Sequence, residues 1–329
     1  MNPLFLLPLH GICCVPFCTQ KTVNHRYELT VDFNAIEFNK SQKPIWSLID
    51  EGDRYHSEVL LFKNKEQNTN QSIPSENYLL QINCQGKGLF KISDNEMTID
   101  WQSVGTDSAH YFQTLAVALY LELKQVLCIH ANALAFENSA IALVAPSRTG
   151  KTTLTAALSQ QGFSLMTDDM MALHKTKHGY HIYPSWPVAR MWPDSLAALK
   201  IDNKEKTDKV HNNFSKRIVS LDKENNFNFC DKAKPLKVIY LLNRLPEKIT
   251  EEAAICEIKP IKTAQAIIIL LQNSILGSCY RALNLEKSRI KALSELLDKI
   301  SFKQINYISG KEYLTDVGEL IKHDIKEAL

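Results

Sequence analysis

No stretch of this 329-residue sequence approaches the roughly 20 consecutive apolar residues that a membrane-spanning helix needs. The sequence also lacks an excess of charge of one sign, because 38 basic and 36 acidic side chains leave a formal charge of +2. Nothing in this balance predicts a nucleic acid or a membrane surface as a partner. Apolar residues make up 45% of the chain and charged residues 22%, which excludes wholesale disorder and fibrous architectures. The composition therefore predicts a globular protein.

The eight cysteines form no Cys-x-x-Cys pair and no spacing typical of a disulfide framework. We therefore expect free, mostly buried thiols, as in proteins of the reducing cytosol. The segment Leu4–Cys18 is fairly apolar, but no lysine or arginine precedes it and no small-residue cleavage site follows it. Because a secretory signal needs both features, the sequence predicts a cytoplasmic protein.

Two polar stretches and one helical pattern divide the chain. The stretch Lys63–Asn77 is typical of a solvated loop among short strands, and residues 202–235 are rich in Lys, Asn and Asp, which predicts a polar flap. Between them, apolar residues at three- and four-residue spacing predict a helix over Ser108–Lys124. We therefore expect a strand-rich N-terminal module over residues 1–125, ending in that helix. An α/β domain, with a mixed sheet flanked by helices, should follow over residues 126–329.

The residues with chemical potential concentrate around the segment Ala145–Thr152. A buried strand is predicted over residues 141–144 and a helix over residues 153–161, so the segment has the position and composition of a phosphate-binding loop, with alanine in place of the usual first glycine. Backbone N–H groups of such a loop point at phosphate oxygens, and the helix dipole favours negative charge there. The candidate nucleotide-binding residues are Pro146, Ser147, Arg148, Thr149, Gly150, Lys151, Thr152 and Thr153.

Three side chains of this loop have distinct expected roles. Lys151 has the position of the ammonium that reaches the β- and γ-phosphates, and Thr152 has that of the hydroxyl that ligates Mg²⁺. Arg148 either projects over the γ-phosphate or points to water, and the sequence leaves both open. The alternative for the whole segment is a turn with an exposed lysine.

Two consecutive carboxylates follow the next predicted strand. Gly162 ends the helix, a strand is predicted over Phe163–Thr167, and Asp168 and Asp169 come directly after it. In a βαβ unit the second strand returns parallel to the first, so this pair should emerge at the sheet edge that carries the loop. Paired carboxylates there can divide two tasks, one holding Mg²⁺ and one accepting a proton from a nucleophile. The alternative is an aspartate pair that caps a loop.

A histidine is expected beside the same loop. Residues 126–136 are typical of a strand and residues 137–139 of a turn, and folding this hairpin about residue 138 places His130 opposite Pro146. There the imidazole could orient or polarise a carboxylate. A histidine in a strand is otherwise a core residue with its hydrogen bonds satisfied.

Three further basic residues are candidates for substrate contacts. Arg190 stands at a predicted strand end, where its guanidinium could clamp a phosphate or a carboxylate, or form a structural salt bridge. Lys216 and Arg217 lie in the polar stretch. They could close on a phosphate or an acidic peptide, or belong to a solvated face.

These motifs together resemble the HPr kinase/phosphorylase superfamily, and most closely the HPr-kinase-like proteins found near ribosomal-peptide biosynthesis genes, including lasso peptide kinases. The resemblance rests on His130-Ala-Asn-Ala, on the loop Ala145–Thr152, on Leu165-Met-Thr-Asp-Asp169 and on the aromatic and proline-rich segment Tyr183–Asp194. It implies a P-loop fold of the HPr-kinase/PEP-carboxykinase type, with ATP and Mg²⁺ as cofactors and phosphoryl transfer to a serine.

The resemblance also assigns roles to individual residues. It implies that Asp168 is the general base, that His130 supports Asp168, and that Lys151 binds the phosphates. Asp169 and Thr152 are then the metal ligands. Two positions depart from the family pattern, because Ala145 replaces the first loop glycine and Arg148 stands where HPr kinases carry a second glycine.

The sequence as a whole predicts an ATP- and Mg²⁺-dependent kinase that transfers the γ-phosphoryl group to a serine hydroxyl of a peptide or small protein. A small-molecule kinase acting on an amino acid or a sugar is one alternative. A non-catalytic nucleotide-binding regulator is another. The resemblance to hexameric HPr kinases leaves a homo-oligomer open, although no residue pattern in the chain demands one.

Overall fold

The computed structural model describes residues 3–18, 25–39, 41–51, 56–65, 76–84, 86–102, 107–146, 149–191, 217–221, 228–246 and 254–327. Of the predicted site residues, Ser147, Arg148 and Lys216 lie outside these ranges, as does most of the polar flap predicted over residues 202–235. No helix within the described ranges combines the length and the apolar character needed to cross a membrane.

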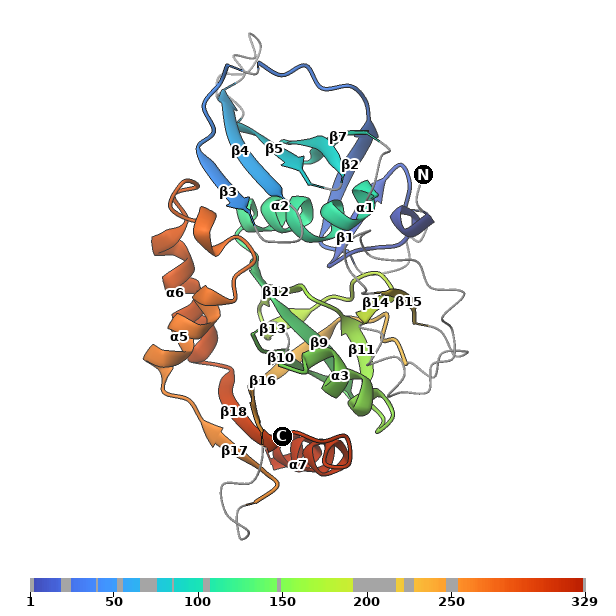
Figure 1. Ribbon diagram of the computed structural model, residues 1–329, viewed down its shortest axis with the longest axis vertical. Helices are drawn as coiled ribbons and strands as arrows, with labels where there is room; N and C mark the ends of the chain where they lie inside the picture. The colour runs from blue at the N-terminus through green and yellow to red at the C-terminus, as the bar shows by residue number, and fades with distance from the viewer. Residues whose placement is uncertain are drawn as a thin grey trace.

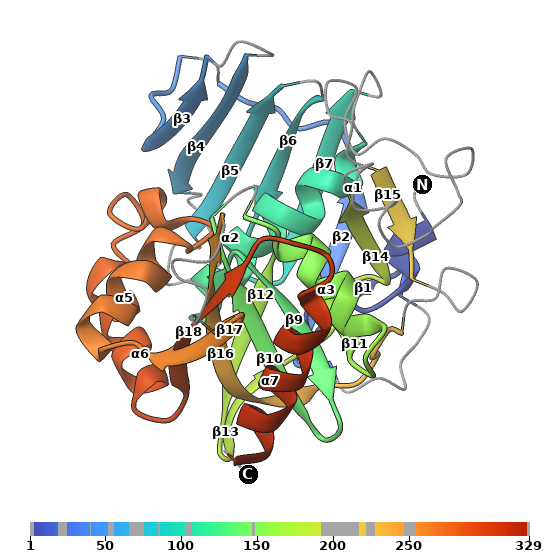
Figure 2. The same ribbon diagram turned by 60° about the horizontal axis from the view of Figure 1, so that its bottom comes forward.

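The N-terminal part is a seven-stranded sheet followed by a helical segment (Figure 1). Its elements are a 3₁₀ turn Pro3–Leu6, β1 Ile12–Val15, β2 Tyr27–Phe33, β3 Trp46–Asp50, β4 Ser57–Lys65, β5 Glu76–Asn83, β6 Lys87–Ile92, β7 Glu96–Gln102, α1 Ser108–Tyr111, a π-helical stretch Phe112–Ala116 and α2 Val117–Leu123. The strands lie in the order β1-β2-β7-β6-β5-β4-β3. The helical segment lies between this sheet and the rest of the molecule (Figures 1 and 2).

The remaining chain is built on a nine-stranded mixed sheet. Its strands are β8 Leu127–Ile129, β9 Ala131–Phe136, β10 Ser139–Val144, β11 Ser164–Thr167, β12 Met171–Thr176, β13 Gly179–Ile182, β16 Lys234–Leu245, β17 Cys256–Pro260 and β18 Ser301–Ile308. The order is β11-β9-β10-β16-β13-β12-β8, with β18 pairing β16 and β17. A separate ribbon pairs β14 Val188–Met191 with β15 Arg217–Ser220, and the helices are α3 Lys151–Ser159, α5 Thr263–Gln272, the 3₁₀ turn Gly277–Cys279, α6 Glu286–Leu297 and α7 Leu314–Glu327.

Helices cover both faces of this sheet because its central strand is apolar on both sides. Every residue of β10 is buried, and successive side chains of a strand point to opposite faces. Ile141 and Leu143 pack in a cluster with side chains of α3 and α7, whereas Ala142 and Val144 pack in a cluster with those of α5 and α6. The protein is thus a mixed α/β protein, in which a parallel pair, β10 and β16, forms the centre of the sheet.

A third apolar cluster joins the two parts of the chain. Phe112 and Leu119 of the helical segment pack in one cluster with Met170, Trp186 and Tyr280 of the later part. The ring centroids of Phe112 and Trp186 are 5.9 Å apart in a stacked arrangement. A continuous core therefore crosses the boundary at residue 125, and the division into two domains there stays a prediction.

The hairpin that leads into the loop is present, with a register one residue away from the predicted one. Val144 pairs with Ala131, and this ladder continues to Ala145, not Pro146, opposite His130. The prediction was wrong by one position because the turn has two residues where three were expected. The chain also changes partners at His130, since β8 pairs with β12 while β9 pairs with β10 and β11.

The two polar stretches are shorter than the sequence predicted. Lys63 and Asn77 lie within the paired strands β4 and β5, and residues 66–75 lie outside the described ranges. The stretch 202–235 contains β15 and the first residues of β16. The eight cysteines are free thiols, as predicted.

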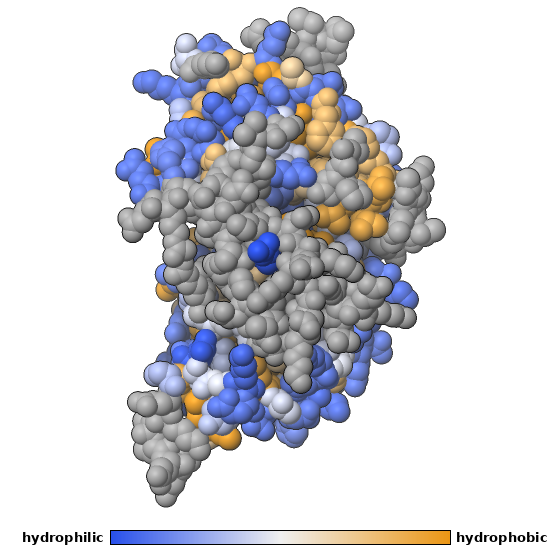
Figure 3. Space-filling model, turned by 45° about the vertical axis from the view of Figure 1, so that its right-hand side comes forward, coloured by the Kyte–Doolittle hydropathy of each residue, from blue (hydrophilic) through white to orange (hydrophobic). Residues whose placement is uncertain are grey.

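The N-terminal part also carries exposed apolar surface. Figure 3 shows hydrophobic residues gathered over the upper part of one face. Leu48 and Ile49 are 51% and 52% exposed, and both lie on β3, the outermost strand of the seven-stranded sheet. An exposed apolar edge strand is a surface on which another strand can pair.

Candidate functional site

The predicted loop connects the end of β10 to the start of α3. Gly150 adopts a left-handed conformation with φ +93°, and a Cβ at this position would lie 3.2 Å from Tyr307 Oη. The same Tyr307 hydroxyl donates a hydrogen bond to the Thr149 carbonyl at 3.3 Å. A glycine is thus required where the chain turns from the loop into the helix, and Lys151 follows as the first helical residue.

The two aspartates at the end of β11 have different surroundings. Asp168 is 3% exposed, and its Oδ2 accepts a hydrogen bond from the Arg190 backbone N–H at 2.7 Å. Asp169 is left-handed with φ +62°, and its side chain is 20% exposed. The two consecutive carboxylates therefore point in different directions. Asp168 is bonded inside the protein, and Asp169 reaches the surface of the site.

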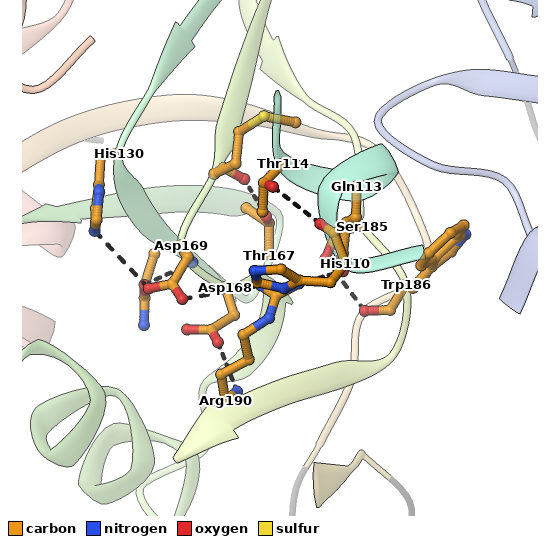
Figure 4. A network of polar contacts seen from close by, with 12 residues as sticks. His110, Gln113, Thr114, His130, Thr167, Asp168, Asp169, Ser185, Trp186 and Arg190 are labelled. Carbon is orange, nitrogen blue, oxygen red and sulfur yellow. Dashed lines mark hydrogen bonds and ion pairs between the residues drawn. The ribbon is translucent and has the colours of Figure 1, made fainter. Parts of the chain in front are cut away.

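Three basic side chains converge on the carboxylate of Asp169, and Figure 4 shows two of them, His130 and Arg190. His130 Nε2 lies 3.8 Å from Oδ1, and Lys151 Nζ lies 4.0 Å from the same oxygen. The Arg190 guanidinium lies 3.8 Å from Oδ2. Lys151 and Arg190 are almost fully buried, so these contacts are shielded from solvent and stronger than those of surface ion pairs.

Arg190 comes to this position from the β14–β15 ribbon. Its guanidinium also donates a hydrogen bond to Gln113 Oε1 of the π-helical stretch. The sequence left two roles open for Arg190, a clamp for a phosphate or carboxylate of the substrate and a structural salt bridge. In the structure its guanidinium forms an ion pair with the carboxylate of Asp169. Gln113 is a partner that the sequence did not indicate, because 77 residues separate it from Arg190.

Asn132 is a second site residue for which the sequence alone indicates no role. Its Oδ1 accepts a hydrogen bond from the Asp169 backbone N–H at 3.1 Å, and its Nδ2 donates to Thr155 Oγ1 of α3 at 3.0 Å. The side chain is fully buried. A signal for it existed, since residues 130 and 132 both lie in the strand predicted over residues 126–136, and alternate residues of a strand point to the same face.

A cavity of about 500 Å³ opens beside His130 and Asp169. It is also lined by Ala145, Pro146 and Met170, by Thr114 and Leu115 of the helical segment, and by a wall of residues 272–275 at the end of α5. This volume lies in the range of small-molecule sites.

The structure therefore brings together most of the predicted site. Lys151, Asp168, Asp169, His130 and Arg190 meet at one edge of the nine-stranded sheet. The ion pair of His130 is with Asp169, whereas the resemblance paired this histidine with Asp168. Thr152 and Thr153 lie on the first turn of α3, and Arg217 lies opposite Met191 in the ribbon, one position from Arg190.

The donor set fits a magnesium–nucleotide complex. Among the described residues, no group of three or more His, Cys, Asp or Glu side chains forms a metal cluster. In nucleotide sites, however, Mg²⁺ uses one or two protein carboxylates and completes its coordination with waters and phosphates. An aspartate pair, the hydroxyl of Thr152 and a buried ammonium at a helix N-terminus supply what that mode of binding needs.

Comparisons with known proteins give limited information. No family model matches the sequence, and no curated protein matches it. Among solved structures, the chain is similar to the HPr(Ser) kinase/phosphatase from Coxiella burnetii, with 14% sequence identity over 61% of this chain and 92% of that chain, at a TM-score of 0.34. A TM-score this low does not establish a shared fold.

Proposed function

We propose that the protein is a Mg²⁺- and ATP-dependent phosphotransferase that phosphorylates a hydroxyl group, a serine of a peptide or small protein. The observation that carries this proposal is the contact between Lys151, at the first residue of the helix after the loop, and Asp169, at the edge of the acceptor-sized cavity. A cation for phosphate and a carboxylate for a proton thus lie 4.0 Å apart.

Each side chain then has a task that its position supports. Lys151 and the N-terminal backbone of α3 bind the phosphates. Thr152 and one carboxylate of the aspartate pair would hold Mg²⁺, which balances the charge of the β- and γ-phosphates when bound. Arg190 is held by Gln113 and supplies a positive charge beside the two carboxylates.

We assign the proton-accepting role to Asp169 in place of Asp168. Asp169 lines the cavity, whereas Asp168 is buried and bonded to the backbone of Arg190. A general base must come within hydrogen-bond reach of the hydroxyl it deprotonates. His130 is then a positioning residue, because its imidazole contacts the carboxylate at the oxygen that also faces Lys151.

The test follows label from γ-labelled ATP with Mg²⁺ into the protein, peptide and small-molecule fractions of a lysate of the source cells. We expect Asp169→Asn to lower transfer by about 10²- to 10⁴-fold while Mg-ATP still binds, and Lys151→Met to weaken both. Asp168→Asn should lower transfer less, because an amide oxygen still accepts the bond from Arg190 N–H. Asp298→Asn, at the exposed end of α6, is the matched control and should behave as the wild type.

Two results would overturn these assignments. If Asp168→Asn abolishes transfer and Asp169→Asn does not, the base is Asp168, as the resemblance implies. If the wild type binds Mg-ATP and no fraction gains label, the protein is a nucleotide-binding regulator and not a transferase.

A further inference from the structure

We propose that the cavity beside Asp169 is the acceptor site and that it selects an acceptor whose hydroxyl is surrounded by uncharged groups. This inference rests on the proposed function and adds the residues that determine specificity. They are Thr114 of the π-helical stretch and Gln272, Asn273 and Ser274 at the end of α5.

The position of the cavity decides its role. It is lined by both His130 and Asp169 and also by Ala145 and Pro146, the first two residues of the loop. A hydroxyl group inside it therefore lies next to the proposed base and on the side of the loop where a γ-phosphate would be presented. The volume of about 500 Å³ exceeds what a single hydroxymethyl group fills, so the cavity also holds neighbouring parts of the acceptor.

The chemistry of the lining determines which charge on the acceptor the cavity accommodates. Among the described residues that line the cavity, the polar groups other than His130 and Asp169 are the neutral amides and hydroxyls of Thr114, Gln272, Asn273 and Ser274, and no lysine or arginine is present. An acceptor with its own carboxylate or phosphate would need a cationic partner. Placed here, it would face Asp169, and the three basic groups near this carboxylate, those of His130, Lys151 and Arg190, already contact it. The described lining therefore offers no further cation for the acceptor, and the like charges repel. Leu115, Met170 and Ile275 complete the lining and favour an apolar body.

The wall made by residues 272–275 is fixed to strand β8 and to His130, which follows it. The His130 backbone N–H donates to the Asn273 carbonyl at 2.6 Å, and the Ile275 N–H donates to the Cys128 carbonyl at 3.0 Å. The side chains of Asn273 and Ser274 donate to carbonyls of the last turn of α5, at 2.8 and 2.9 Å. Their oxygens are therefore held in fixed directions. A preorganised wall of this kind discriminates between acceptors because it does not rearrange to fit them.

The test measures binding of defined probes by saturation-transfer NMR. The probes are the neutral peptide Ac-Ala-Ser-Ala-NH₂, the acidic peptide Ac-Asp-Ser-Asp-NH₂, and glucose as an uncharged small molecule with hydroxyls. The variant is Gln272→Trp, which places a large ring at the cavity mouth from an exposed position, and Gln265→Trp, exposed on the same helix, is the matched control. Asn273→Ala is a second variant that removes a polar group without filling space. Binding of Mg-ATP is measured in parallel on every protein.

We expect a neutral probe to bind the wild type at least tenfold more tightly than the acidic peptide does. That affinity should fall at least tenfold in Gln272→Trp and stay unchanged in Gln265→Trp, with Mg-ATP binding equal in all proteins. Preference for the peptide or for glucose then assigns the acceptor to a chain or to a small molecule. Equal binding of acidic and neutral peptides, absence of binding by both neutral probes, or unchanged binding in Gln272→Trp would overturn the inference. Failure of the wild type to bind Mg-ATP would overturn the proposed function instead.

Discussion

The side chain of Asn132 connects Asp169 to helix α3. Its Oδ1 accepts a hydrogen bond from the Asp169 backbone N–H, and its Nδ2 donates to the Thr155 hydroxyl one turn after Lys151. One buried amide therefore links the backbone of Asp169 to the helix that begins at Lys151. A left-handed backbone at a residue other than glycine, as at Asp169, persists only where the surrounding structure enforces it.

Replacement of Asn132 tests this connection. We expect Asn132→Ala to lower the rate of phosphoryl transfer at least tenfold and the stability by about 1–3 kcal/mol, because a buried N–H and a buried hydroxyl lose their partner. The affinity for Mg-ATP should change much less than kcat. Separate kcat and KM values, with urea unfolding, measure the three quantities. Asn243→Ala removes an exposed amide that donates a hydrogen bond to Asn306, and it should leave kcat unchanged. Equal losses of kcat and of nucleotide affinity in Asn132→Ala would show that Asn132 only supports the fold.

A buried ion pair joins helix α2 to helix α6. Arg289 of α6 contacts the carboxylate of Glu122 of α2 through its Nε, and both side chains are almost fully buried. Glu122 Oε1 also accepts hydrogen bonds from the Cys128 backbone N–H and from the Tyr280 hydroxyl, both at 2.9 Å. Burial raises the pKa of Glu122 in spite of the neighbouring guanidinium.

We expect Arg289→Met to destabilise the protein by about 3–5 kcal/mol, because it leaves a buried carboxylate without its counter-charge. The double variant Glu122→Gln with Arg289→Met should recover a substantial part of this loss, since neither charge then remains. Urea unfolding of the single and double variants measures the coupling. Additive effects of the two substitutions would contradict the expectation. Lys291→Met, on the exposed face of the same helix, is the control.

Two buried histidines make the stability depend on pH. Burial lowers the pKa of His10 and of His174 from 6.5 to about 3, with Arg26 and His181 adding repulsion to His174. Both rings are thus neutral in the folded protein and charged in the unfolded chain below pH 6.5. Their contribution is present above this value and is lost as the pH falls towards 3.

Between about pH 7 and pH 5 the loss should be about 2 kcal/mol for each histidine. Urea unfolding at several pH values checks this expectation. In His174→Phe, which keeps a ring among Tyr27 and Tyr183, the dependence on pH should be about half as steep. His323→Gln, exposed on α7, should retain the full dependence, and an equally steep dependence in His174→Phe would refute the account.

The edge strand β3 should govern association of the protein with itself. Ile49 is 52% exposed on this outermost strand, and a charged residue on an edge strand opposes strand pairing. We therefore expect Ile49→Lys to lower concentration-dependent association, measured by sedimentation velocity. Ile268→Lys, at a 56% exposed apolar position on α5, is the control. If both variants associate as the wild type does, the edge strand plays no part.

The local parts of the site could be predicted from the sequence. A buried strand, a loop ending in Gly150-Lys151 and a helix are consecutive, and helix and strand lengths suffice to bring Asp168 and Asp169 back to the same edge. The one-residue error at His130 arose from turn geometry, because a turn of two residues and one of three differ little in sequence but change every pair of the ladder.

The remaining parts depend on contacts between distant segments. Gln113 with Arg190 and Glu122 with Arg289 are separated by 77 and 167 residues, and nothing in the local pattern of either partner indicates the other. The wall at residues 272–275 could not be predicted either, because the sequence shows only the end of an apolar helix there. The different surroundings of the two aspartates also came from the fold, since the left-handed conformation of Asp169 has no clear sequence signal.

The apolar cluster that crosses residue 125 has a consequence for how the protein can be divided. Thr114 and Leu115 line the cavity, and Gln113 contacts Arg190, so the first part of the chain contributes directly to the site. A fragment that begins at residue 126 would expose Met170, Trp186 and Tyr280, which pack against the helical segment, and it would also lack one side of the cavity. The loop and its aspartates therefore do not form a complete site by themselves, because the site also needs residues from the first part of the chain.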